Sequence, residues 1–215
     1  MSTTIDVYPT TDYLPLVEET RSRTQELYQN LLNRYGIDST VEVKAFYLSK
    51  TRDEEVQYVN PLTRWEVGMN LGFAYLINGQ WRASSWPSLW SRDLVNQFDV
   101  DDYEQSHGEY GYPASQLGKV APLSSDDFGI PLTAEELSLI NAQNHSWYEY
   151  RNLGGPAASS TGYGFVVAAL AEETRGYIAS DDGAFDFNHS GETAEQFLTW
   201  WGDEQMLFYG KESFQ

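Results

Sequence analysis

Acidic and tyrosine side chains cluster between residues 99 and 112. This group comprises Asp99, Asp101, Asp102, Tyr103, Glu104, Glu109, Tyr110 and Tyr112. No lysine or arginine occurs between Arg92 and Lys119. Tyrosine supplies contact area at a low cost in rotamer entropy, and carboxylates pair with basic side chains and steer association. The composition therefore predicts a surface that binds a basic protein partner.

A second acidic stretch lies near the C-terminus. Between residues 181 and 204 the chain has seven acidic residues and no basic one. We expect Asp181, Asp182 and Asp186 to contribute to the same partner-binding surface. A solvated surface that binds nothing has a similar composition, so that plainer interpretation stays open.

The negative charge is distributed unevenly along the chain. The formal net charge is -19, with 12 acidic and 9 basic residues in positions 1 to 96 and 20 acidic and 4 basic residues in positions 97 to 215. A general pressure for solubility or salt tolerance would act on both halves, so the asymmetry favours a local role. The charge opposes direct contact with nucleic-acid phosphates or an anionic membrane and attracts a basic partner.

The remaining motifs predict no catalytic residue, no cofactor and no metal. His107, His145 and His189 are too scattered for a histidine-based zinc site, and the acidic turn before His189 matches no calcium loop. The segment from Gly154 to Gly164 is rich in glycine and serine but lacks the Gly-Lys-Ser/Thr ending of a phosphate-binding loop. No G-x-S-x-G nucleophile motif occurs.

Two other functions remain open. The aromatic content is 15%, and Trp81, Trp86 and Trp90 could stack on sugar rings in a carbohydrate-binding module or a glycoside-active enzyme that uses paired carboxylates. An open cleft lined by tryptophan and two carboxylates would favour that alternative, and complete burial of the rings would exclude it. A DNA-mimicking inhibitor is the other alternative, and it requires acidic residues spaced along an elongated ridge.

The composition favours one domain of the α+β class, with an antiparallel sheet and several packed helices. A chain of 215 residues with 41% hydrophobic residues can bury one sizeable core, and we expect residues 1 to 215 to form it. There is no cysteine, so packing alone must hold the core. The N-terminal segment does not resemble a secretory signal, and no stretch has the length of a membrane span, which favours a cytoplasmic location.

Hydrophobic periodicity predicts the elements of the first half. Spacings of three, four and seven predict a helix within residues 11 to 35, ended by Gly36. Alternation predicts strands at 41 to 47 and 56 to 59. Asn78-Gly79 predicts a tight hairpin between strands at 71 to 77 and 80 to 83. An amphipathic pattern after Pro87 predicts a helix that reaches Phe98.

The second half begins with a long stretch that has no clear period. Residues 99 to 132 read as an acidic surface loop. The capping-box pair Thr133 and Glu136 predicts a helix that continues past Trp147 and Tyr148 to the glycines before Pro156. The later elements are predicted as a connection at 154 to 164, strands at 165 to 170, 177 to 179 and 184 to 187 in a three-stranded meander, and a helix from Ser190 or Thr193 to Gly202.

The C-terminal segment carries a resemblance to a known group of proteins. A strand, an Asp-Asp-Gly turn, a second strand with alternating aromatic residues and a helix that opens ETAEQFLTWW follow one another over residues 176 to 201. This order resembles the closing segment of bacterial toxin-neutralising immunity proteins, including the SMI1/KNR4-like group. The resemblance implies a small cytoplasmic protein that binds a cognate toxin, often a nuclease with a basic cleft, and blocks its active site without catalysis of its own.

If the 99 to 112 cluster binds a basic partner, neutralising it should weaken the complex. We expect the combined variant Asp101→Asn, Asp102→Asn and Glu104→Gln to bind less tightly, because three carboxylates that pair with basic groups are lost, and to show a weaker dependence of affinity on salt. Titration calorimetry at two salt concentrations measures both effects. Wild-type affinity in this variant would contradict the prediction.

Overall fold

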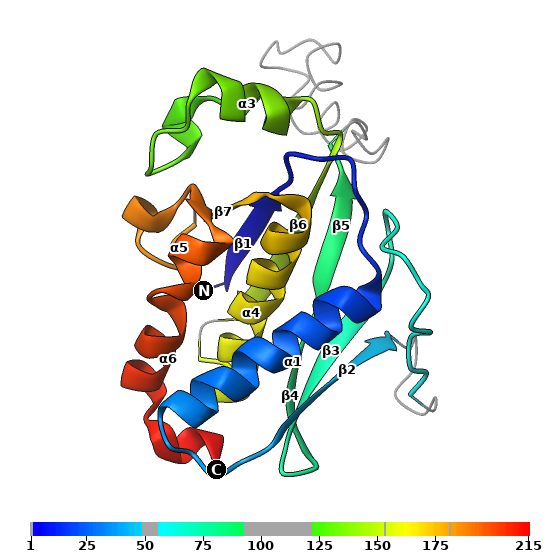
Figure 1. The fold of residues 1–215 in the computed structure, drawn as a ribbon, viewed down its shortest axis with the longest axis vertical. Coiled ribbons are helices and arrows are strands. Elements are labelled where there is room, and N and C mark those ends of the chain that lie inside the picture. The colour runs from blue at the N-terminus through cyan, green and yellow to red at the C-terminus, as the bar shows by residue number, and fades with distance from the viewer. Residues whose placement is uncertain (1, 49–55, 93–121, 153, 181) are drawn as a thin grey trace, which may run out of the picture.

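The chain folds into two antiparallel sheets packed against helices, which confirms the predicted α+β class (Figure 1). The computed structural model describes residues 2–48, 56–92, 122–152, 154–180 and 182–215. The strands are β1 (Ser2–Tyr8), β2 (Val41–Tyr47), β3 (Leu71–Ile77), β4 (Gln80–Ser85), β5 (Pro87–Ser91), β6 (His145–Asn152), β7 (Tyr177–Ala179) and β8 (Glu192–Thr193). The α-helices are α1 (Val17–Arg34), α3 (Ala134–Asn141), α4 (Ala157–Thr174), α5 (Ala194–Leu198) and α6 (Trp201–Tyr209). Short 3-10 helices lie at Ser125–Asp127, Phe187–His189 and Lys211–Phe214.

Strand β1 occupies the middle of the larger sheet, whose order is β5-β6-β1-β7-β8. It pairs antiparallel with β6 on one side and with β7 on the other. Ile5 and Val7 are fully buried, as expected for alternate side chains of a strand that point into the core. The smaller sheet has the order β2-β3-β4.

Helix α4 lies at the centre of the main core. Figure 1 shows it beside α1 and across the larger sheet. Every residue from Ser160 to Ala171 is buried, so this helix has no solvent-facing stripe. A helix that is apolar or small-sided on all faces is suited to such a position. Gly162 and Gly164 let its backbone approach Tyr75 and Trp201 closely, because a Cβ at either position would overlap those rings.

A second, smaller core lies on the opposite face of the larger sheet. On β7, Ile178 belongs to the main core, whereas the next residue, Ala179, packs with Phe128, Leu132 and Ile140. The ring of Tyr8 on β1 meets Phe128 edge to face at 5.8 Å between centroids. Helix α3 and the segment before it therefore cover part of the face that α4 leaves open.

Several predicted elements are confirmed. The strands at 41 to 47 and 177 to 179 are present, and the hairpin turns at Asn78 and Gly79, whose φ values are 53° and 74°. Gly36 follows α1, which begins at Val17 rather than near Asp12. Thr133 caps α3 through the predicted capping box, and Thr193, one of the two predicted starts, caps α5.

Near the middle of the chain, one predicted helix is wrong and another is shorter than predicted. The segment after Pro87 forms β5 through Ser91, with Leu89 buried and Trp90 exposed, because a short apolar run fits both a strand and a helix. The helix after Thr133 ends at Asn141, and Trp147 lies in β6 instead. Pairing with β1 and β5 on both sides decides the conformation of β6.

The predictions for residues 154 to 202 also need correction. The expected connection at 154 to 164 and strand at 165 to 170 are together helix α4 from Ala157 onward. Glycine and serine have low helix propensity, but here small side chains are required for close packing. No strand forms at 184 to 187, so the predicted meander is wrong, and Gly202 lies within the first turn of α6 rather than ending a helix.

Three further differences concern the chain outside these segments. Strand β1 was not predicted from its short alternating sequence. Residues 56 to 59 form only an isolated bridge, between Tyr58 and Phe46, rather than a strand. In the predicted acidic loop, residues 99 to 121 lie outside the described residues, and residues 122 to 132 contain one short 3-10 helix.

Replacement of Gly164 by alanine tests the close packing of α4. In a helix without tertiary contacts this change stabilises by about 1 kcal/mol, but overlap with the Trp201 indole should reverse the sign and cost about 1–3 kcal/mol. Urea unfolding measures the difference. Ser159→Ala, at a partly exposed position of the same helix, should change the stability by less than about 1 kcal/mol. An unchanged or higher stability for Gly164→Ala would contradict the packing.

Candidate functional site

The corner between the two sheets is the best-defined candidate site. Strand β4 leaves the smaller sheet at Ser85, and after a single residue, Trp86, the chain enters the larger sheet as β5. The backbone N–H of Trp86 donates to Oε1 of Glu149 on β6 at 2.8 Å. Glu149 is 1% exposed. A buried carboxylate therefore fixes the corner by satisfying an amide that belongs to neither ladder.

A β-bulge determines where Trp81 points. Leu76 of β3 lies opposite Trp81, but the next residue, Tyr75, lies opposite Ala83, so Arg82 is an extra residue in β4. Simple alternation would place Trp81 on the same side as Ala83, towards the core. The bulge shifts the register and places Trp81 on the outer side instead.

The bulge and the corner together produce an exposed aromatic surface, which we call the tryptophan face and define as Trp81, Trp86, Trp90 and Tyr148. The three tryptophan side chains are 43%, 49% and 48% exposed, respectively. Trp81 meets the ring of Phe46 at 5.2 Å, and Trp90 meets Tyr148 at 5.8 Å between centroids. These contacts hold the rings of Trp81 and Trp90 in place while about half of each residue stays exposed.

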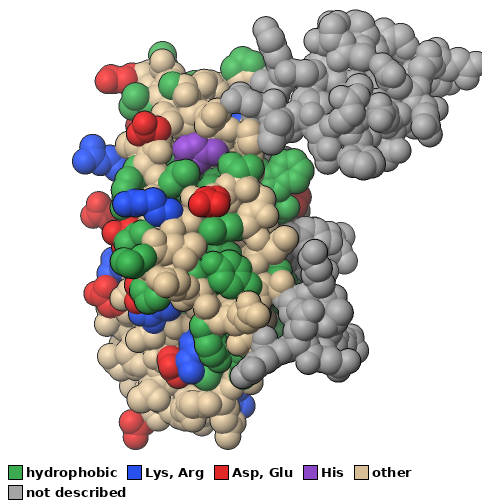
Figure 2. All heavy atoms as spheres, turned by 90° about the vertical axis from the view of Figure 1, so that its right-hand side faces the viewer, with side chains coloured by type: hydrophobic (Ala, Val, Ile, Leu, Met, Phe, Trp, Pro, Cys, Tyr) green, Lys and Arg blue, Asp and Glu red, His purple; other side chains and the backbone are tan. Residues whose placement is uncertain are grey.

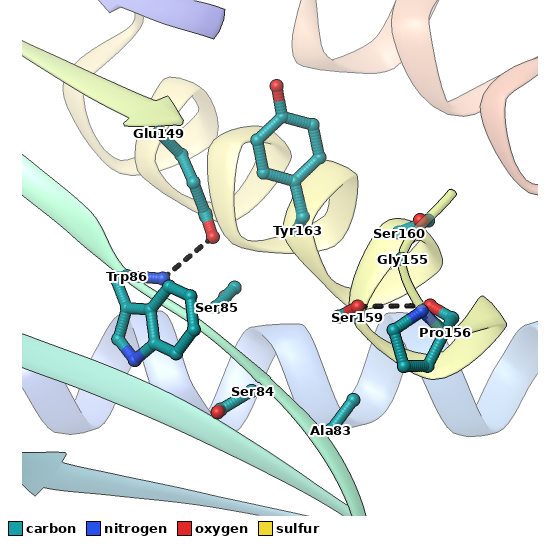
Figure 3. Close-up of a pocket in the computed structure, with 10 residues that line it drawn as sticks. All are labelled: Ala83, Ser84, Ser85, Trp86, Glu149, Gly155, Pro156, Ser159, Ser160 and Tyr163. Atoms are coloured by element: carbon teal, nitrogen blue, oxygen red, sulfur yellow. Dashed lines mark hydrogen bonds between the residues drawn. The ribbon is translucent and has the colours of Figure 1, made fainter. Parts of the chain in front are cut away.

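A pocket of about 380 Å³ lies beside the corner, between β4 and the first turns of α4. It is lined by Ala83, Ser84, Ser85, Trp86, Glu149, Gly155, Pro156, Ser159, Ser160 and Tyr163. Figure 3 shows Trp86 and Glu149 on one side of the pocket and Pro156 and Ser159 on the other. Sequence reasoning singled out Trp86 and the Gly154 to Gly164 stretch but missed Glu149, whose only signal is an acidic residue in an otherwise aromatic strand.

The acidic residues predicted to bind a partner are only partly described. Asp99, Asp101, Asp102, Tyr103, Glu104, Glu109, Tyr110, Tyr112 and Asp181 lie outside the described residues. Asp182 accepts hydrogen bonds from the backbone N–H of Thr4 at 2.7 and 2.8 Å and from the Thr4 hydroxyl at 3.0 Å. Asp186 accepts from the N–H of Asn188 at 3.0 Å and caps the 3-10 helix there. Both carboxylates thus stabilise the fold locally.

Other acidic side chains of the second half also bind groups of the protein itself. Glu172 on α4 holds Arg23 of α1 through two hydrogen bonds of 2.6 and 2.8 Å. Asp203 on α6 pairs with Arg34 at the end of α1. On the face shown in Figure 2, red and blue side chains are interspersed, mostly towards the left, and hydrophobic side chains form separate patches. That face of the described residues shows no continuous acidic patch.

Glu192 organises the segment after β7. Its Oε1 lies 2.6 Å from Nδ1 of His189, and its Oε2 accepts from the indole N–H of Trp200 at 2.6 Å. Trp200 is thereby held by hydrogen bonding, and Trp201 is 1% exposed in the core. Within the ranges that the structure describes, no three His, Cys, Asp or Glu side chains are placed to bind a metal ion together.

Burial shifts the pKa of one carboxyl group strongly. The pKa of Glu173, near the end of α4, is raised to about 8, mainly because burial disfavours the charged form. A hydrogen bond from the Thr20 hydroxyl at 3.0 Å opposes this shift. The negative charges of Glu19 and Glu172 add to it. Glu173 lies away from the pocket and the tryptophan face, so this shift concerns stability.

Comparisons of the chain with protein-family models, with curated proteins and with solved structures found no match. None of the helices in the described part of the chain has the length and apolar character required to cross a bilayer. The comparisons therefore give no information about function.

The shifted pKa of Glu173 predicts a pH-dependent stability. Its pKa is raised in the folded state from an ordinary value of 4.5 to about 8. The contribution of protonated Glu173 to the free energy of unfolding is therefore fully present below pH 4.5 and is lost as the pH rises through about 8. Glu173→Gln keeps the acceptor for Thr20 and should remove this loss, so that the variant is more stable than the wild type at pH 8 but not at pH 4. Urea unfolding at both values measures it, with exposed Glu195→Gln as the control. An equal pH dependence in Glu173→Gln and wild type would contradict the assignment.

Proposed function

We propose that this chain is a non-enzymatic binding protein that holds a basic protein partner on its tryptophan face. The observation that carries the proposal is the set of three half-exposed indoles in β4, at the corner and in β5, of which the bulge directs that of Trp81 outward. Tryptophan and tyrosine are enriched among the few residues that supply most of the binding energy of protein interfaces. The face therefore has the composition of an interface centre.

The charge of the chain supports a basic partner. A net charge of -19 attracts cationic proteins over about a Debye length and speeds their association. Lysine and arginine side chains of the partner can also lie over the faces of tryptophan rings. The acidic residues 99 to 112 and 181 are proposed to add to this attraction. Asp182 and Asp186 contribute charge while they serve the fold.

The finer proposal is a cytoplasmic immunity or inhibitor protein that occludes the active site of a basic toxin or nuclease. The resemblance of residues 176 to 201 to bacterial immunity proteins supports it in part, because β7, the turn after it and helix α5 follow in the expected order, although the second strand of that order does not form. A DNA mimic needs acidic groups in a regular row, and the carboxylates described above are instead used as caps and ion pairs. We therefore retain the compact interface rather than mimicry.

Substitution on the tryptophan face tests the proposal. We expect the chain to form a complex with a basic protein encoded by the neighbouring gene when the two are produced together. Trp90→Ala should weaken that complex by about 2 kcal/mol or more, or roughly 30-fold in Kd, because an interface anchor is truncated. Titration calorimetry measures the affinity.

Phe208→Ala provides the matched control. Phe208 is an aromatic residue on α6 that is 79% exposed and lies outside the tryptophan face. Its replacement should leave the affinity unchanged. Equal loss in both variants, or full affinity in Trp90→Ala, would overturn the proposed surface, and absence of any complex would overturn the proposed partner.

A further inference from the structure

We infer that the pocket beside the sheet corner binds a neutral, polyhydroxylated ring such as a monosaccharide unit. This site is distinct from the protein-binding role proposed above, although Trp86 borders both. Its volume of about 380 Å³ falls in the lower part of the range of pockets that hold small molecules. The side chains and backbone groups that line the pocket indicate this kind of ligand.

Hydroxyl groups line the pocket from two elements. Ser84 and Ser85 belong to β4, and Ser159 and Ser160 belong to the first turns of α4. The Ser159 hydroxyl donates to the carbonyl of Pro156 at 3.0 Å, and its oxygen can accept from a ligand. The Ser160 oxygen accepts from the Tyr209 hydroxyl at 2.8 Å, and its own O–H can donate. The α4 side of the pocket therefore offers both an acceptor and a donor, as the hydroxyl groups of a sugar require.

The edge of β4 adds backbone groups on the opposite side of the pocket. Within the described residues, β4 is the last strand of the smaller sheet, with β3 on one side and no strand on the other. An edge strand directs one of its two rows of backbone N–H and C=O groups away from the sheet. Ala83, Ser84 and Ser85 of this edge all line the pocket, and we infer that part of this row borders it. Backbone groups of this kind commonly fix the orientation of small ligands.

A flat apolar ring lies on each side of the pocket. The indole of Trp86 lies on one side of the hollow and the ring of Pro156 on the other (Figure 3). A sugar ring has C–H groups on its faces and hydroxyl groups around its edge, so it suits a slot with apolar sides and a polar wall. Trp86 remains 49% exposed, which leaves its ring accessible to a ligand.

The charge of the lining selects a neutral ligand. No lysine, arginine or histidine occurs among the described residues that line the pocket, and the net charge of the chain further opposes an anion. Glu149 supplies the one carboxylate of that lining, and its Oε1 already accepts from the Trp86 amide. A phosphate-bearing ligand is therefore disfavoured, although a glycine- and serine-rich segment precedes and begins α4.

The number of carboxylates in the described lining also indicates binding of a sugar rather than its hydrolysis. Glycosidases of the common type place two carboxyl groups on either side of the bond that is cleaved, about 5–9.5 Å apart. The described lining has a single carboxylate, which is buried and engaged at the corner. The pocket thus has the groups for recognition of a sugar and lacks the pair for its hydrolysis.

The test uses the isolated full-length chain, so its outcome is independent of any protein partner. Indole N–H signals of the ¹⁵N-labelled protein are followed while glucose, galactose, N-acetylglucosamine and maltose are added at millimolar concentration. We expect at least one of these neutral saccharides to shift the Trp86 signal in a saturable manner. Glucose 6-phosphate and choline, added in the same way, represent anionic and cationic ligands and should bind more weakly.

Variants locate the binding site. Trp86→Ala keeps the backbone amide that Glu149 accepts but removes the indole, and it should weaken saccharide binding about tenfold, equal to about 1.4 kcal/mol. Trp90→Ala removes an equally exposed indole outside the pocket and should leave binding unchanged. Ser159→Phe fills the pocket from the α4 side and should abolish saccharide binding. Circular dichroism confirms that each variant is folded.

Three outcomes would overturn the inference. The first is the absence of any saturable shift with all four neutral saccharides in the folded wild type. The second is equal weakening by Trp86→Ala and Trp90→Ala, which would place the sugar on the open face rather than in the pocket. The third is tighter binding of choline than of every saccharide, which would identify the carboxylate of Glu149 as a site for an organic cation.

Discussion

The close approach of helix α4 to its neighbours is the constraint on which the rest of the structure depends. The helix is buried along most of its length, and its backbone at Gly162 and Gly164 touches aromatic rings from β3 and α6. Interiors are close-packed, so even one added methyl group at such a contact is felt. Because α4 also packs on α1 and on the larger sheet, its position fixes the distance between its first turn and β4. The pocket occupies that space.

Carboxylates supply several of the contacts that hold this cysteine-free chain together. Glu149 holds the corner between the sheets, Asp182 extends the bonding of β1 beyond the end of β7, and Glu172 links α4 to α1. Hydrogen bonds to charged groups are stronger than neutral ones. The acidity of the described second half is therefore partly a consequence of how the fold is held together, and the proposed attraction of a basic partner adds to that role.

The proposed protein-binding surface and the inferred sugar pocket meet at Trp86. The amide of this residue is fixed by Glu149, and its indole projects between the open face and the pocket. A residue with a rigid backbone and a half-exposed ring can take part in recognition at low entropic cost, because little freedom remains to be lost. The geometry thus provides a reason for two neighbouring recognition sites, one for a protein and one for a small ring-shaped ligand.

The sequence by itself determined those features that depend on neighbouring residues. Asn78 and Gly79 specified a hairpin, Thr133 and Thr193 specified helix starts, and the alternation from Val41 to Tyr47 specified a strand, because turn geometry, capping and periodicity are local. The fold class followed from such signals, whereas Trp86 was named only as one of three tryptophans that could stack on sugar rings. Tertiary structure alone decided that the glycine- and serine-rich segment before Phe165 is a buried helix, since its small residues gain stability only from the rings packed against them. It also decided the bulge that turns Trp81 outward and the contact of Glu149 with the Trp86 amide, which joins residues 63 positions apart and leaves no mark on the local pattern.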